Sequence, residues 1–128
     1  MKLKQNSRCS ISEHDEQAAL FYYLAHHPDL WVVFAIPNGG VRNKVTAAKL
    51  KREGVTAGVW DIFVPIPAAA FHGLFIEMKF GKNKLTQSQI KFGKQMVENG
   101  YKCLVCYNAI EAYNAIVKYL GIASKFEF

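Results

Sequence analysis

Residues 61–64 read DIFV and residues 74–79 read LFIEMK, and we expect these two apolar segments to be neighbouring antiparallel strands of one sheet. Because side chains alternate between the two faces of a strand, Glu77 and Lys79 are expected on one face and Met78 on the other. Acidic residues are disfavoured in strands, so a strand that carries two opposite charges among apolar residues requires an explanation.

Asp61 and Glu77 have two interpretations on the residues alone. Two carboxylates held close together repel each other, and burial makes the repulsion worse. A divalent cation removes this conflict, because hard cations such as Mg²⁺ bind carboxylate oxygens. The alternative is an exposed sheet face on which Glu77 and Lys79 pair with neighbouring side chains. The spacing is compatible with both.

Two further polar residues can reach the same region from helices. Glu13 lies in the first turn of an expected helix, where acidic residues usually interact only with the helix dipole. Gln89 is the third residue of another expected helix, where it matches a capping box that begins at Thr86. Each residue therefore has an ordinary structural role as well as a role in a site, and the residues alone leave both open.

The remaining elements follow from apolar spacing, capping residues and glycines. We expect helices over residues 12–25, 44–53, 86–100 and 108–121, and further strands over residues 31–36 and 101–107. Residues 31–36 (WVVFAI) are apolar throughout, so we expect that strand to be covered on both faces. Short strands with interleaved helices are typical of an α/β fold with a mixed sheet flanked by helices.

The charge of the chain favours a polyanionic partner. Lys and Arg outnumber Asp and Glu by 16 to 10, which gives a net charge of +6. Several of the acids lie in the candidate site, so the rest of the surface is more basic than this total indicates. Such a surface favours nucleic acid as the partner. The alternative is a soluble protein that is merely basic.

The length of 128 residues fits one domain. We expect a loose N-terminal arm over residues 1–11, a single domain over residues 12–121 and a C-terminal tail over residues 122–128. No apolar run approaches the roughly 18 residues of a membrane span, and the N-terminus does not have the pattern of a secretory signal. We therefore expect a cytoplasmic protein that does not enter a membrane.

The three cysteines favour reduced thiols, because their number is odd and no secretory signal is evident. Cys103 and Cys106 have a CxxC spacing but lie in an apolar, strand-like segment. Residues three apart on a strand point to opposite faces, which is poor geometry for sharing a zinc ion. We expect these two cysteines to be packed in the interior rather than bound to metal.

An ordered series of motifs along the chain resembles the VRR-NUC family of the PD-(D/E)XK nuclease superfamily. The motifs are residues 12–17 (SEHDEQ), residues 36–40 (IPNGG) with Arg42, residues 54–55 (GV), residues 58–61 (GVWD), residues 73–79 (GLFIEMK), and residues 85–86 (LT) with Gln89. The resemblance covers roughly residues 12–120 and is closest to the stand-alone phage and bacterial members. It implies a restriction-endonuclease-like core with a mixed central sheet of about four strands between helices.

The resemblance implies a role for each residue of the D…ExK motif. Asp61 and Glu77 would hold Mg²⁺ or Mn²⁺, with the backbone carbonyl of Met78 as a further ligand. Lys79 would orient or deprotonate the attacking water and balance charge near the scissile phosphate. One or two ions are equally compatible with the motif.

The resemblance also implies roles for two helical residues. Glu13 would add a helix-borne carboxylate to the site, directly or through water, and Glu16 is the alternative if the helix register differs. Gln89 would lie at the edge of the site and orient the lysine or the phosphate.

Residue 60 departs from the family pattern. The motif commonly has Pro before its aspartate, whereas this chain has Trp60. Proline fixes the backbone but binds no metal, so the substitution does not exclude the chemistry. The indole either packs in the core or stacks beside DNA, and we favour the core.

Basic residues in two segments are expected to contact the DNA backbone. They are Arg42, Lys44, Lys49, Lys51 and Arg52 in and before the second helix, and Lys82 and Lys84 in the loop before the third. Phosphate contacts position a protein without reading sequence. The alternative for the helix is a solvated face with no partner.

The resemblance therefore implies a Mg²⁺-dependent nuclease that hydrolyses DNA phosphodiester bonds. Stand-alone relatives look like homodimers that cut branched DNA such as Holliday junctions, in the cytoplasm of a bacterium or of a phage-infected host. Two alternatives remain: a non-catalytic nucleic-acid-binding module of the same fold, and a nuclease that acts on RNA or on simple duplexes.

Overall fold

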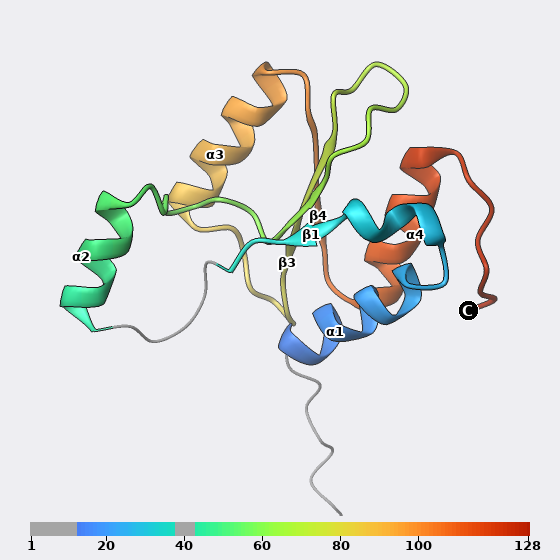
Figure 1. Cartoon of the computed structure of the whole chain (residues 1–128), viewed down its shortest axis with the longest axis horizontal. Coiled ribbons are helices and arrows are strands. Elements are labelled where there is room, and N and C mark those ends of the chain that lie inside the picture. Colours follow the sequence, from blue (N-terminus) through green and yellow to red (C-terminus); the bar gives the residue numbers. More distant parts are fainter. Residues whose placement is uncertain (1–12, 38–42) are drawn as a thin grey trace, which may run out of the picture.

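The computed structural model describes residues 13–37 and 43–128 (Figure 1). The elements in chain order are α1 (Glu13–Leu24), the 3-10 helix η1 (Pro28–Val32), β1 (Phe34–Ala35), α2 (Lys44–Arg52), β2 (Ile62–Val64), β3 (Leu74–Met78), α3 (Gln87–Glu98), β4 (Lys102–Cys106) and α4 (Ala109–Leu120). The expected N-terminal arm and the turn at residues 38–42 lie outside the described residues.

One four-stranded sheet organises the described chain, in the order β1-β2-β3-β4. β1 pairs with β2 and β2 with β3 in antiparallel fashion, while β3 and β4 are parallel. A parallel pair needs a crossover connection, and α3 supplies it. The predicted fold class is therefore confirmed: the chain is an α/β protein with a mixed four-stranded sheet and flanking helices.

Helices cover both faces of this sheet. Leu20 of α1 and Ile116 of α4 belong to one buried cluster with Ile76 of β3, so α1 and α4 cover one face. On the other face, the rings of Phe75 in β3 and Phe92 in α3 meet edge to face with centroids 5.2 Å apart. Glu77 lies two residues after Phe75 and therefore points to the α3 side.

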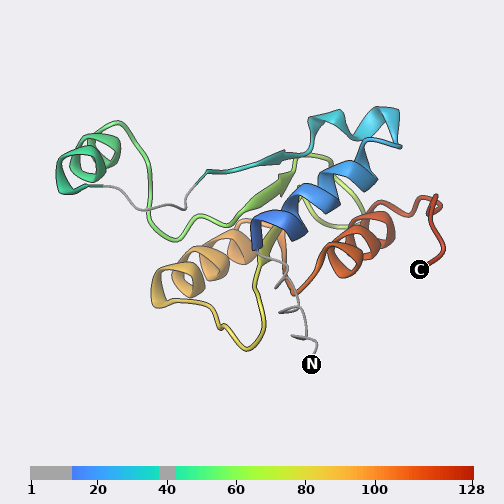
Figure 2. The ribbon, with the colours of Figure 1, turned by 90° about the horizontal axis from the view of Figure 1, so that it is seen from below.

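Helix α2 is separated from these layers. Figures 1 and 2 both show it projecting away from the sheet and the other helices. None of its residues is buried. Asn43 caps its first turn by accepting a hydrogen bond from the backbone N–H of Thr46 at 2.7 Å. The helix is thus a solvated element with local capping.

The strand predicted over residues 31–36 is mostly wrong. Residues Pro28–Val32 form η1, and only Phe34–Ala35 pairs with β2. Proline suits the first turn of a helix because its fixed φ is already helical and its missing N–H is not needed there. Trp31 is 83% exposed and Phe34 is 48% exposed, so this segment is not covered on both faces.

Helices α3 and α4 begin with different capping contacts. The capping box predicted at the start of α3 is confirmed, because Thr86 and Gln89 bond to each other's backbone amides. At α4, the side chain of Asn108 accepts from the backbone N–H of Glu111. The Glu111 carboxylate, however, accepts from the amide of Tyr107 at 3.3 Å, one residue before the cap.

The last residues have no helix or strand but still contact the core. The ring of Phe126 lies 5.0 Å from that of Tyr23 in α1, and the backbone N–H of Lys125 donates to the hydroxyl of Tyr113 at 3.0 Å. Within the described ranges, no helix combines the length and apolar character needed to cross a membrane.

Candidate functional site

Asp61 lies immediately before β2, where backbone contacts fix its position. Its carbonyl accepts a hydrogen bond from the backbone N–H of Ile36 at 2.6 Å. Its carboxylate oxygen Oδ2 accepts from the backbone N–H of Met78, at the end of β3, at 2.9 Å. The antiparallel pairing of β2 and β3 therefore brings the Asp61 carboxylate to the strand position next to Glu77.

Glu77 is a buried acid with only one of its oxygens satisfied. The residue is 3% exposed, and Oε1 accepts from the side-chain amide of Gln89 at 3.0 Å. Its other oxygen, Oε2, is buried and has no hydrogen-bond partner. Leaving a buried carboxylate oxygen unpaired is costly, so this atom needs either a proton or a cation. The exposed-face interpretation of Glu77 is therefore wrong.

Burial raises the pKa of Glu77 to about 8, and the neighbouring charge of Asp61 contributes to the rise. The charge of Lys79 acts in the opposite direction and lowers the pKa of Glu77. The geometry agrees with these effects, because the Asp61 carboxylate is bound to the amide of Met78 and Lys79 lies two residues after Glu77 on the same strand face. The structure therefore brings the two acids and the lysine together at one corner of the sheet.

This donor set fits a hard divalent cation. The two carboxylates of Asp61 and Glu77 lie close together, and the buried oxygen without a partner belongs to Glu77. A cation would neutralise the negative charge of this pair. Among the residues whose side chains are described, no group of three or more His, Cys, Asp or Glu side chains could hold a metal. A complete coordination shell would therefore have to include backbone oxygen, water or a residue outside that part of the chain.

The structure tests only in part the predicted contribution of an acidic residue from helix α1. Glu13 is the first residue of α1, but its side chain lies outside the described part, so its role stays a prediction. Glu16 is engaged elsewhere: its carboxylate oxygen Oε2 accepts from the backbone N–H of Ala109 at 2.6 Å. Acids are stabilising at a helix N-terminus, so Glu16 ties α1 to the start of α4. This bond occupies one of its two carboxylate oxygens, and its role as the alternative to Glu13 stays a prediction.

Gln89 makes the predicted capping contact and also contacts the buried acid, while its predicted role in orienting the lysine or the phosphate stays a prediction. Its side-chain oxygen accepts from the backbone N–H of Thr86 at 2.9 Å, which completes the capping box. Its side-chain amide donates to Oε1 of Glu77. Because one side chain makes both bonds, the start of α3 is held directly against the buried carboxylate.

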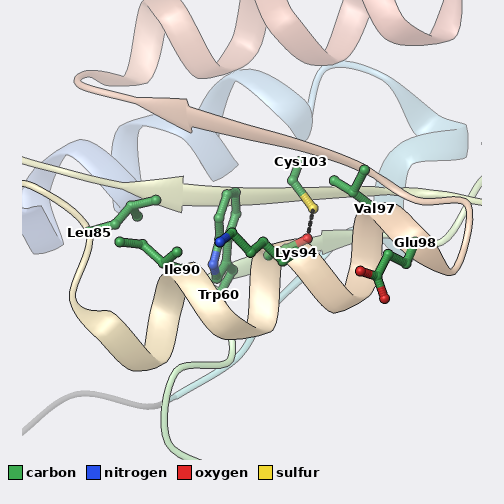
Figure 3. Close-up of a pocket in the computed structure, with 8 residues that line it drawn as sticks. Trp60, Leu85, Ile90, Lys94, Val97, Glu98 and Cys103 are labelled. Atoms are coloured by element: carbon green, nitrogen blue, oxygen red, sulfur yellow. Dashed lines mark hydrogen bonds between the residues drawn. The ribbon is translucent and has the colours of Figure 1, made fainter.

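Trp60 packs in the core, as favoured from the sequence. It is 4% exposed, and its indole N–H donates to the backbone carbonyl of Gln89 at 2.9 Å. Figure 3 shows the ring behind α3, where it lines a pocket of about 420 Å³ together with Leu85, Ile90 and Cys103. The pocket lining includes neither Asp61 nor Glu77, so the pocket is separate from the acidic corner.

The two described cysteines behave as packed thiols. Burial raises the pKa of Cys103 to about 11 and that of Cys106 to about 12. Metal ligation needs the thiolate, which such pKa values disfavour near neutral pH. The Cys103 thiol also donates to the carbonyl of Gly93 (Figure 3). The predicted interior packing is confirmed for Cys106, which is buried, whereas Cys103 is half-buried and lines the pocket beside Trp60.

The basic residues lie on two exposed segments. Lys44, Lys49, Lys51 and Arg52 are exposed on α2, and Lys82 and Lys84 are exposed on the loop between β3 and α3. That loop leads from Lys79 directly to the turn that carries Gln89, so its lysines lie close in the chain to the acidic corner. Arg42 lies outside the described residues.

Sequence reasoning missed two glycines that determine how α3 approaches the site. A Cβ atom on Gly93 would lie 2.8 Å from the Trp60 ring, and one on Gly58 would overlap the backbone of Ser88. A glycine in a helix interior is unfavourable, which was the available signal for Gly93. The contact partner of either glycine has no signature in the sequence.

Comparison with known proteins supports the resemblance by structure. The sequence matches no protein-family model and no curated protein. A solved structure described as "VRR_NUC domain protein" matches with a TM-score of 0.73 and 25% sequence identity, over 88% of this chain and 90% of that chain. The structural resemblance to VRR-NUC is confirmed, and the chain has a VRR-NUC-like fold.

Replacing Glu77 by Gln should change the pH dependence of stability in metal-free buffer. Since the pKa of Glu77 is raised to about 8, the folded protein keeps a proton that the unfolded chain releases above its ordinary value of 4.5. Stability therefore falls as the pH rises through this window. We expect Glu77→Gln to melt several degrees above wild type at pH 9, with a smaller difference at pH 5, by thermal unfolding in EDTA.

The same substitution at the exposed Glu98 provides the control for this comparison. Glu98→Gln should leave the melting temperature within about 1 °C of wild type at both pH values, because exposed substitutions change stability little. Identical pH slopes for Glu77→Gln and wild type would show that Glu77 titrates normally.

Proposed function

We propose that this chain, which has the VRR-NUC-like fold, is a metal-dependent endonuclease that hydrolyses DNA phosphodiester bonds. The homology indicates a nuclease. The observation that carries the proposal is the pair of half-buried Asp61 and buried Glu77, with one Glu77 oxygen unpartnered, beside the charge of Lys79. We further propose that branched DNA, such as a Holliday junction, is the preferred substrate.

In this proposal, Asp61, Glu77 and the carbonyl of Met78 hold Mg²⁺ or Mn²⁺, with Glu13 contributing directly or through water. The ion supplies positive charge against the negative charge that builds on the phosphate and on the leaving oxygen. The chain orients the two acids in advance: the Met78 amide fixes Asp61, and the Gln89 amide fixes Glu77. Such preorganisation lowers the cost of reaching the transition state.

Lys79 and Gln89 complete the catalytic group in this proposal. Lys79 is half-buried at the end of β3, and its backbone N–H donates to the carbonyl of Cys106 at 2.9 Å. This backbone bond ties the residue to β4, so its ammonium starts from a fixed point near the acids. There the ammonium orients the attacking water and balances charge at the scissile phosphate, or the neutral amine accepts the proton of that water. Gln89 holds the Glu77 oxygen that it contacts.

DNA affinity is assigned to the exposed basic residues of α2 and of the loop before α3, together with Arg42. Backbone contacts of this kind carry no sequence information, which favours recognition of DNA structure. A two-fold homodimer would present two sites to symmetric strands of a junction. Such an enzyme would act in the cytoplasm of a bacterium or of a phage-infected host.

A cleavage panel with linear, flap, splayed and four-way DNA tests the proposed activity and its substrate. We expect cutting with Mg²⁺ or Mn²⁺, none in EDTA, and the highest rate on the four-way substrate. Asp61→Ala and Glu77→Ala should each lower kcat by at least ~10²–10³-fold, the scale seen when one charge-stabilising group is lost. DNA binding by gel shift should stay equal or become tighter, because a repulsive charge is removed.

Asp29→Ala controls this panel with an exposed acid on η1 and should cut at the wild-type rate. Retained cleavage in both site variants would remove Asp61 and Glu77 from the reaction. Cleavage of RNA or linear duplex at the four-way rate would contradict the proposed substrate, while the metal site would stand.

Lys79→Ala should lower kcat by about 10²–10⁴-fold, the usual contribution of a positioned acid–base group. The melting temperature should stay near wild type, because the residue is only half-buried and its backbone bond to Cys106 is retained. Single-turnover cleavage and thermal unfolding measure the two quantities. Wild-type turnover by the Lys79→Ala protein would show that the lysine amine is not needed in catalysis.

Lys49→Ala combined with Lys51→Ala tests the assignment of α2 to DNA binding. Each lost phosphate contact should reduce the slope of log K against log salt by roughly 0.9. Fluorescence anisotropy between 50 and 200 mM salt measures this slope. Lys118→Ala, on the exposed side of α4, provides the comparison and should leave the slope unchanged. An unaltered slope in the α2 double variant would place the DNA elsewhere on the protein.

A further inference from the structure

We propose that Trp60 is a positioning residue for the acidic corner. Its indole N–H holds the backbone of Gln89, and the side chain of Gln89 in turn fixes the Glu77 carboxylate. The catalytic consequence of this arrangement rests on the proposed nuclease function, while its effect on metal affinity does not depend on cleavage.

A continuous chain of contacts links these residues. The Trp60 indole N–H donates to the Gln89 carbonyl at 2.9 Å, and the Gln89 side-chain amide donates to Oε1 of Glu77 at 3.0 Å. Trp60 directly precedes Asp61 in the sequence. One loop therefore carries the first acid and also determines where the second acid is held.

Close packing restricts the position of the indole against α3. Gly93 lies four residues after Gln89, one turn along the same helix face. A Cβ atom at residue 93 would lie only 2.8 Å from the Trp60 ring. The ring can reach the Gln89 carbonyl because this turn of α3 has no side chain in its way.

A second contact presses the same loop against the first turn of α3. Gly58 has a φ of +89°, and a Cβ atom there would overlap the backbone carbonyl of Ser88. Ser88 directly precedes Gln89. The loop therefore touches α3 at Ser88, Gln89 and Gly93, which fixes the helix start relative to Asp61.

The orientation of Glu77 depends on this fixed helix start. Gln89 occupies Oε1 of Glu77 and leaves the buried Oε2 without a partner. The free oxygen is the one available to a cation. If Gln89 shifts, Glu77 loses the hydrogen bond that selects this orientation, so metal affinity should fall although no metal ligand has changed.

The donor of the hydrogen bond from Trp60 to Gln89 can be removed without introducing bulk into the core. Figure 3 shows the ring bordering the pocket between Ile90 and Lys94, with Cys103 on the neighbouring strand. Phenylalanine is smaller than tryptophan and has no N–H, and it lacks the outer ring atoms of the indole that lie against Gly93. Trp60→Phe therefore removes the donor without introducing bulk.

A double-mutant cycle on the whole chain tests the proposal, with Trp60→Phe, Gln89→Ala and the double variant. We expect each single variant to weaken Mn²⁺ binding by about tenfold in titration calorimetry, the lower end for residues that support metal ligands. On the preferred DNA, kcat should fall by a similar factor while KM changes little. The double variant should be no worse than Gln89→Ala, because both changes break one chain of contacts.

Trp31→Phe is the matched control, since it makes the same substitution at a residue that is 83% exposed. It should match wild type in Mn²⁺ affinity and kcat. Thermal unfolding of each variant confirms that the proteins compared are folded.

The outcomes separate this inference from the proposed function. Two results would overturn the positioning role and leave the nuclease proposal intact. One is a double variant whose loss of Mn²⁺ affinity is the product of the two single losses. The other is a Trp60→Phe protein with wild-type Mn²⁺ affinity. A wild-type protein that binds Mn²⁺ but cuts no DNA would overturn the nuclease proposal, and the calorimetric cycle would still decide the positioning role. A protein that neither binds Mn²⁺ nor cleaves would overturn both.

Discussion

The electrostatic conflict between Asp61 and Glu77 is the constraint around which this structure is arranged. The pairing of β2 with β3 places both carboxylates at one corner of the sheet, and burial raises the pKa of Glu77 to about 8. A folded protein rarely retains such a pair without a counter-charge, because the desolvation of each acid opposes folding. The local contacts hold the pair in place instead of relieving it, which is the arrangement expected when a cation provides the compensation.

Helix α3 connects this corner to the rest of the fold. It is the crossover between the parallel strands β3 and β4, so its start must lie near the end of β3. That start also has the positive end of the helix dipole, which favours nearby negative charge. Gln89 joins the two requirements, because it closes the capping box and bonds to Glu77. The same residue thus stabilises the helix and orients the acid.

The sequence predicted local features better than exposure or distant contacts. The strand pair and the capping box at Thr86 depend on residue types at short spacing, and the structure confirms both. The strand predicted over residues 31–36 is mostly wrong because an apolar run does not reveal that Trp31 belongs to η1. It also does not reveal that the short strand β1 lies at the sheet edge, where Phe34 is 48% exposed. The bond from Trp60 to Gln89 joins residues 29 apart, and no periodicity encodes such a contact.

The distribution of charge argues against a protein that only binds DNA. Its exterior is basic, with exposed lysines on α2, yet the corner where α3 begins has two carboxylates close together. Carboxylates near DNA repel phosphate and weaken binding, so a pure binding module gains affinity by losing them. A nuclease needs both parts: the basic surface holds the backbone, and the acids bind the cation that acts on it. Because α2 has no buried residue, its charge can change without disturbing the acids. In the proposed nuclease, DNA affinity and catalysis would therefore be separable.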